Sequence, residues 1–193
     1  MKLDHRLSVL LATAAVVSAC GGGDGNATNA DATASNKWVA NNGAYAGCDN
    51  NHKKRTVTLR AFGSNQATLT IREDIYDGPD CSGTLKGSFS YSSPITITLE
   101  STGISAVSGV GAGTQNLSID RMQFSAPAMT SSLTGLGVQG LCVYYINGYS
   151  CYNTMSYSAT MGSAGLYFSG NTMASLSVNG AIYVADTPLL TKQ

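Results

Sequence analysis

An alternation of apolar and polar residues with a period of two is the strongest constraint on the fold of this chain. It is clear in residues 56–61 and again in 67–72, on either side of a Gly-Ser-Asn turn at 63–65. Further strands are expected at residues 85–91, 95–99, 116–124, 138–146, 149–160, 164–169 and 174–184. Successive side chains of a strand point to opposite faces, so each segment directs apolar groups to a core and Thr, Ser or Arg to water.

No comparable helical pattern occurs beyond the first twenty residues. Thr, Ser, Val and Gly dominate where a helix would need Ala, Leu, Glu or Lys. Asn147-Gly148 is the strongest hairpin signal, because both residues tolerate the positive φ of a type I′ turn. Many short strands joined by turns predict an all-β domain, an antiparallel meander barrel with a β-sandwich as the alternative.

The N-terminus has the pattern of an export signal. Two basic residues, Lys2 and Arg6, precede the uncharged stretch 7–19, which is too short to span a bilayer and suits an N-terminal signal helix. The stretch ends Val17-Ser18-Ala19-Cys20, which resembles the lipobox of bacterial lipoproteins. That resemblance implies that residues 1–19 are a lipoprotein signal peptide and that Cys20 is acylated. It also implies an outer-membrane location, since Gly rather than Asp follows the cysteine.

Residues 20–36 are expected to form the lipidated cysteine and a flexible tether. The tether consists almost entirely of Gly, Asn, Ala, Thr, Asp and Ser, so it cannot bury enough apolar surface to offset its ordering entropy. Residues 37–193 follow without an internal linker and are expected to form a single β domain. The predicted protein is therefore anchored in the outer membrane by lipid and faces the periplasm.

Four cysteines, an even number, remain in the predicted domain, which favours disulfides in an exported protein. We expect Cys48 to pair with Cys81 and Cys142 with Cys151. A two-residue turn at Asn147-Gly148 would place Cys142 diagonally across from Cys151, so a bulge or strand twist would have to close the gap. A metal site is not expected, because no CxxC spacing occurs and the predicted domain holds one histidine.

Charge and motifs argue against nucleic acid and against nucleotide cofactors. The chain has 11 basic and 11 acidic residues, and a nucleic-acid binder needs a basic surface. Residues 135–140 spell GxGxxG, but a dinucleotide fold needs a helix after this motif, and the residues that follow predict a strand. We expect a turn there and no cofactor.

Three polar clusters are candidate sites of chemistry. A Ser-His-Asp arrangement would have to use His52, which lies in a polar loop, and the chain has no G-x-S-x-G elbow. Residues 53–55 (Lys-Lys-Arg) could bind an anion, but three adjacent charges on a strand cannot all face one ligand. Residues 73–80 hold four carboxylates, which could bind Ca²⁺ or hydrolyse glycosides but more simply form a solvated turn. We therefore expect no catalytic residues.

Five tyrosines gather in the second half of the chain and could stack on sugars or line a lipid pocket. Alternation sends two neighbours, Tyr144 and Tyr145, to opposite faces, which favours core packing and cross-strand pairing instead. The five are Tyr144, Tyr145, Tyr149, Tyr152 and Tyr157.

Residues 76–84 fit a Y-x3-DCSGT pattern that resembles a group of uncharacterised exported proteobacterial β-rich proteins, as do 45–48 (YAGC) and 165–170 (GLYFSG). The layout, with Trp38 near the domain start, is similar to calycin-like barrels, although the G-x-W triplet of lipocalins is absent. That similarity implies a barrel that binds small apolar ligands.

We expect a non-enzymatic cell-envelope protein that docks an envelope protein partner or has a structural role. The alternative is a module that binds a lipid or another small apolar ligand inside the barrel. A carrier needs a cavity of roughly 300 Å³ or more, so the interior discriminates between the two hypotheses.

Overall fold

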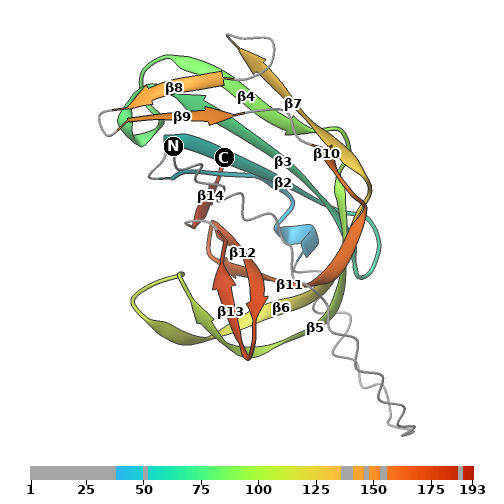
Figure 1. Ribbon diagram of the computed structural model, residues 1–193. Coiled ribbons are helices and arrows are strands. Elements are labelled where there is room, and N and C mark those ends of the chain that lie inside the picture. The colour runs from blue at the N-terminus through green and yellow to red at the C-terminus, as the bar shows by residue number, and fades with distance from the viewer. Residues whose placement is uncertain (1–37, 50–51, 136–140, 146–147, 153–155, 187–188) are drawn as a thin grey trace, which may run out of the picture.

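The protein is described by a computed structural model over residues 38–49, 52–135, 141–145, 148–152, 156–186 and 189–193, with side chains outside 131–155 (Figure 1). The strands are β1 Gly43–Cys48, β2 Lys53–Ala61, β3 Gln66–Tyr76, β4 Leu85–Tyr91, β5 Ile95–Ser108, β6 Thr114–Ala126, β7 Met129–Gly135, β8 Leu141–Tyr145, β9 Gly148–Tyr152, β10 Ser156–Tyr157, β11 Thr160–Ser169, β12 Thr172–Asn179, β13 Ile182–Ala185 and β14 Leu190–Lys192. A helical turn at 38–40 and a short 3₁₀ helix, η1 Pro79–Cys81, complete the regular structure of the described residues. The prediction of an all-β fold is confirmed.

One large sheet contains twelve strands in the order β10-β7-β4-β3-β2-β1-β14-β12-β11-β6-β5-β13, and β8 and β9 form a second, two-stranded sheet. Within the described residues every pairing is antiparallel except that of β13 with β5. The order differs from a simple meander, since β6 pairs with β11 and β1 with β14. These contacts between distant strands are not visible as local patterns in the sequence.

Strand β3 is shared between two neighbours on the same side. Residues 66–69 pair with β5, whereas 72–76 pair with β4. The sheet curls to make the β3–β5 pairing, because these strands stand far apart in the sheet order (Figure 1). Strands β4, β7 and β10 extend the sheet beyond β3.

Most predicted strands are present, with different ends. The strands expected at 56–61 and 67–72 lie within β2 and β3, and Gly63 between them has φ +132°. The segment 174–184, expected as one strand, is a hairpin, because Gly180 at φ +61° begins a two-residue turn between β12 and β13. The sequence did not predict three of the strands. Small residues hide the alternation in β1, Ser and Thr hide it in β7, and β14 is too short to show it.

The main core lies on the inner face of the curled sheet. Its members come from eight of the strands and from the helical turn that carries Trp38. They are Trp38, Tyr45, Val57, Leu59, Ala67, Leu69, Ile97, Leu99, Met122, Phe124, Ala164, Leu166, Met173 and Leu190. One apolar face per strand thus meets the others in a shared interior, as the alternation predicts.

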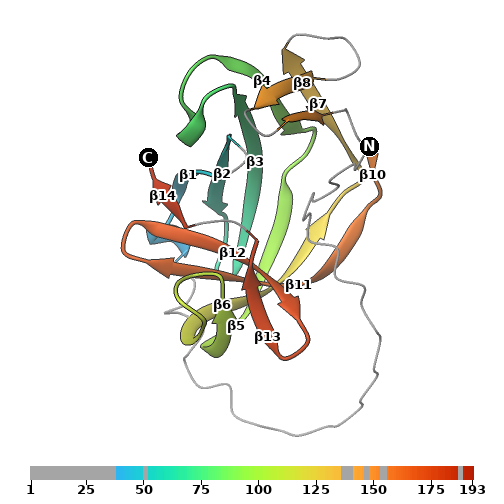
Figure 2. The same cartoon turned by 60° about the vertical axis from the view of Figure 1, so that its left-hand side comes forward.

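A second, smaller core lies on the opposite face of β12. There Leu176 and Ala174 pack with Val107 of β5 and Ile119 of β6. Strand β13 lies beside the far ends of β5 and β6 in both views (Figures 1 and 2) and pairs with β5 through Tyr183 and Val107. The β5–β6 hairpin therefore covers this face of β12 together with β13.

The predicted signal peptide (1–19), the tether (20–36) and Cys20 lie outside the described residues and stay predictions. Among the described residues, no helix has the length and apolar character that crossing a membrane requires.

A candidate ligand-binding cavity

A cavity of about 400 Å³ lies inside the curled sheet. Most of its surface is apolar, with a small number of polar groups. The apolar lining comprises Val57, Leu69, Ile71, Ile95, Ile97, Met122, Phe124, Ala126, Met129, Ala159, Leu166 and Met173. An apolar chamber with a few convergent polar groups is the usual form of a small-molecule site.

Strand alternation explains why these side chains face the cavity. On β6 the buried residues Met122, Phe124 and Ala126 alternate with the exposed residues Gln123 and Ser125. The register places Phe124 opposite Ile97 of β5, which is another lining residue. The alternation is visible in the sequence, but the volume left between the facing strands is not.

A buried ion pair stands at one side of the cavity. Nε and Nη2 of Arg55 both donate to Oε1 of Glu73, with an Nε–Oε1 distance of 2.8 Å. Glu73 is only 4% exposed, and Nζ of Lys53 lies 3.8 Å from its Oε2. Arg55 lines the cavity. Its positive charge is compensated by the carboxylate of Glu73, which is itself buried.

Two tyrosines from the extension of the sheet face each other beside this pair. The rings of Tyr91 on β4 and Tyr157 on β10 have centroids 5.6 Å apart, and both residues line the cavity. Burial raises the pKa of both phenols above the ordinary value. They therefore stay neutral and can donate hydrogen bonds at physiological pH.

Asp186, just after β13, contributes the remaining charged group of the lining. Its backbone N–H donates to the carbonyl of Ser175 at 3.0 Å, which fixes the residue against β12. Its Oδ2 is buried and accepts no hydrogen bond from the described residues. Burial raises its pKa to about 6, while the Ser177 hydroxyl and the Arg55 charge oppose that rise.

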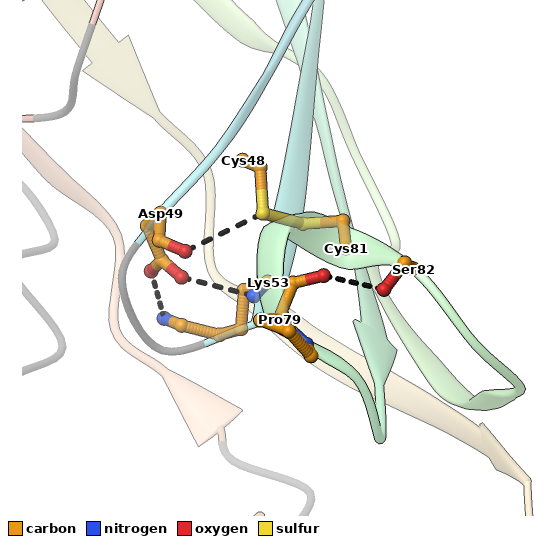
Figure 3. The surroundings of a disulfide bond; sticks show 6 residues. All are labelled: Cys48, Asp49, Lys53, Pro79, Cys81 and Ser82. Atoms are coloured by element: carbon orange, nitrogen blue, oxygen red, sulfur yellow. Dashed lines mark hydrogen bonds and ion pairs between the residues drawn. A yellow bond between two sulfur atoms is a disulfide. The ribbon is translucent and has the colours of Figure 1, made fainter.

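A disulfide lies close to Asp49 and Lys53 (Figure 3). Cys48, the last residue of β1, is bonded to Cys81 in η1, with Cα atoms 5.8 Å apart, so this predicted pairing is confirmed. Beside it, Asp49 accepts a hydrogen bond from the Lys53 backbone N–H at 2.9 Å, and Ser82 donates from Oγ to the Pro79 carbonyl. The bond joins the end of β1 to the connection between β3 and β4.

For the second predicted disulfide the structure changes the register. Cys142 on β8 lies directly opposite Cys151 on β9, rather than diagonally across from it. Tyr145 pairs with Gly148, so Gly148 belongs to β9 and not to the predicted turn. Directly opposed residues of antiparallel strands have Cα separations that suit a disulfide. The Cys142–Cys151 bond stays a prediction, and this register removes the need for a bulge to close the gap.

The carboxylates of residues 73–80 do not form one site. Glu73 faces the interior, which corrects the expectation that it belongs to a solvated turn. Asp74 binds Nε of Arg72 at 2.8 Å, and Asp77 binds Nζ of Lys86 at 2.8 Å. Hydrogen bonds from Lys86 and the Thr84 backbone hold the pKa of Asp77 below its usual value. Alternation along β3 and separate cation partners thus disperse the group.

The other motifs are also separated. His52 has φ +61° in the β1–β2 loop, and among the described residues no His, Cys, Asp and Glu gather as metal ligands. Within the basic run, Lys53 and Arg55 lie on one face of β2 and both approach Glu73. Lys54 lies between them in the alternation. Most of the GxGxxG motif lies outside the described residues, and strand β8 follows it, as the sequence predicts.

Of the five clustered tyrosines, Tyr157 lines the cavity, and the side chains of the other four lie outside the description. Sequence reasoning missed Tyr91 and Asp186 as candidate functional residues. Tyr91 could have been found as an aromatic that ends a predicted strand. Asp186 had no such signal, because its role depends on β13 folding back beside β12.

No family model matches this chain, and neither a curated protein nor a solved structure matches it. The cavity and its polar groups are therefore the basis for any functional argument.

Proposed function

We propose that this protein binds a small, largely apolar molecule inside its β domain. The cavity carries this proposal: its volume of about 400 Å³ falls in the range of small-molecule sites, roughly 300–1,000 Å³. A domain with a purely structural role would be expected to fill this space, because protein interiors are close-packed and empty volume lowers stability.

We infer further that eight strands close into a calycin-like barrel around the cavity. In support, the pairings run from β3 through β2, β1, β14, β12, β11 and β6 to β5, and β5 pairs with β3 again. All eight supply residues to the same core, which suits a barrel interior better than the two facing layers of a sandwich. Interiors of this size can hold one small ligand.

The docking role has less support. The large exposed apolar side chains come from separate segments: Val39, Phe62, Leu85, Ile104, Met161 and Leu189. Apolar side chains exposed singly are normal on protein surfaces. Within the proposal, the lipobox-type Cys20 would hold the binding domain at the outer membrane, facing the periplasm, with residues 20–36 as the tether.

A fluorescence titration tests the proposal. The full chain carrying Cys20→Ser, which needs no detergent if Cys20 is the lipid acceptor, is titrated with N-phenylnaphthylamine, a neutral apolar probe. We expect saturable binding at one site. Ala126→Phe places a ring in the cavity and should weaken binding at least about tenfold.

Ser125→Phe is the matched control, because this neighbouring residue of β6 is exposed on the opposite face. It should bind the probe as the parent does. Absence of probe binding by the folded parent, or equal loss in both variants, would contradict a ligand-binding interior.

A further inference from the structure

The two charged groups that line the cavity differ in whether they have a partner of opposite charge. Arg55 and Asp186 are the charged residues of the described lining. Two donors of Arg55 are already engaged by the buried Glu73. Asp186 has no cationic group within ion-pair distance among the described residues, and its Oδ2 accepts no hydrogen bond there.

A buried carboxylate oxygen without a partner is costly, because the water it gave up is not replaced by another donor. The missing partner must be a hydrogen-bond donor, and a positively charged donor forms the strongest bond with a carboxylate. The interior side chains of β12 that accompany Asp186 are Ser175 and Ser177, which carry no charge. Apart from Arg55, the other polar residues of the described lining are uncharged: Tyr91, Ser156, Tyr157, Ser158, Thr160 and Ser175.

Building on the proposed function, we propose that the ligand is a cationic amphiphile, an apolar body that ends in a protonated amine, and that Asp186 binds the amine. The apolar body would fill the space between Ile97, Phe124 and Met173. A ligand that ends in a carboxylate would be repelled by Asp186. It would also have to compete with Glu73 for Arg55.

A neutral hydroxyl would satisfy the Oδ2 acceptor but would leave the charge of Asp186 uncompensated. Ligands that share one tail and differ only in the head group therefore separate the alternatives. Decylamine, decanol and decanoate form such a set.

The experiment displaces N-phenylnaphthylamine from the full chain carrying Cys20→Ser at pH 7.5, with each amphiphile below its self-association concentration. We expect decylamine to bind about tenfold more tightly than decanol and decanoate to bind most weakly. This order is measured with Asp186 in place, so it does not depend on any variant of this residue folding.

Asp186→Asn then assigns the preference to this side chain. The amide keeps the shape but not the charge, so decylamine affinity should fall to about that of decanol, while decanol affinity changes less than about threefold. Glu100→Gln, which alters an exposed carboxylate paired with Gln123, should leave the order unchanged.

Equal affinities for the three head groups, or tightest binding of decanoate, would overturn the assignment while leaving a ligand-binding interior intact. Retention of the amine preference in Asp186→Asn would overturn it as well. If the parent fails to bind the probe or any of the amphiphiles, both this inference and the proposed function are wrong.

Discussion

Around Trp38 the buried polar atoms of the interior are matched one to one. The indole N–H donates to Oδ2 of Asp120 at 2.9 Å, and the Thr102 hydroxyl donates to Oδ1 at 2.7 Å. Around Asp186, in the same interior, an acceptor stays unmatched and a chamber stays unfilled. We call the first the sealed region and the second the cavity region.

The two regions contain the same kinds of residue but differ in whether the buried polar atoms have hydrogen-bond partners. Asp120 and Trp38 are both essentially inaccessible to water, so their hydrogen bonds satisfy groups that could not be solvated otherwise. In the cavity region Arg55 and Glu73 satisfy each other, while Asp186 does not share in that pair at bonding distance. Complete satisfaction is typical of a structural core, and a localised exception marks a place where another molecule can supply the partner.

Trp38→Ala should be the most destabilising of these changes, because it removes a large buried side chain and one of the donors to Asp120. We expect a loss of about 4 kcal/mol in the free energy of unfolding, measured by urea denaturation. Met129→Ala, which borders the cavity, should cost less, about 2 kcal/mol. Equal losses at the two sites would contradict the division into a packed and an unpacked region.

Removal of the disulfide tests how the strand ends beside the cavity region are held. The double variant Cys48→Ala, Cys81→Ala opens a link across a sequence separation of 33 and should lower the free energy of unfolding by about 3 kcal/mol. Denaturant unfolding with and without reductant measures this. The variant should lose its sensitivity to reductant, apart from any contribution of the predicted Cys142–Cys151 bond.

Acidification should stabilise the protein through Asp186. Its pKa in the folded protein is about 6 rather than 3.8, so the folded state binds the proton more tightly than the unfolded chain does. Stability should therefore rise as pH falls from 7 through 6 toward 4, by on the order of 2 kcal/mol.

Asp186→Asn should remove this rise, which denaturation at a series of pH values measures. Since Asp77 has a lowered pKa and acts in the opposite direction at lower pH, the comparison is made between the parent and the variant at each pH. An unchanged pH profile in the variant would exclude Asp186 as its source.

The smallest effect is expected from enlarging two buried alanines. Ala164 in the packed core is 1% exposed and does not line the cavity, so Ala164→Leu should cost about 1–2 kcal/mol through overpacking. Ala126→Leu has cavity space to enter and should change stability by less than about 1 kcal/mol. Thermal or urea denaturation of both variants measures the contrast, and the reverse ranking would mean that the cavity is not open volume in solution.

Local patterns were sufficient for the fold class and for several strands. The alternation at 67–72 lies within β3. The even number of cysteines in a domain predicted to be exported indicated disulfides, and the predicted Cys48–Cys81 bond is present. The candidate site was much less accessible. Glu73 was expected in a solvated turn, yet it is buried against Arg55, because the β2–β3 register sets the two residues opposite each other on the inner face.

Asp186 shows the limit most clearly. Nothing in its neighbourhood along the chain distinguishes it from an ordinary acidic residue near a strand end. It becomes a buried acceptor only because Gly180 turns the chain and returns β13 to β12, with Asp186 bonded to Ser175.

The sequence by itself determined that the domain is built of β-strands, because side chains alternate along any strand whatever its neighbours are. The pairing of β3 with β5, of β1 with β14 and of β6 with β11 was decided only in the tertiary structure. Those pairings bring together strands that are distant in the chain, and the space between facing side chains depends on all of them at once. The cavity and its unmatched carboxylate are therefore properties of the assembled sheet, which no single segment encodes.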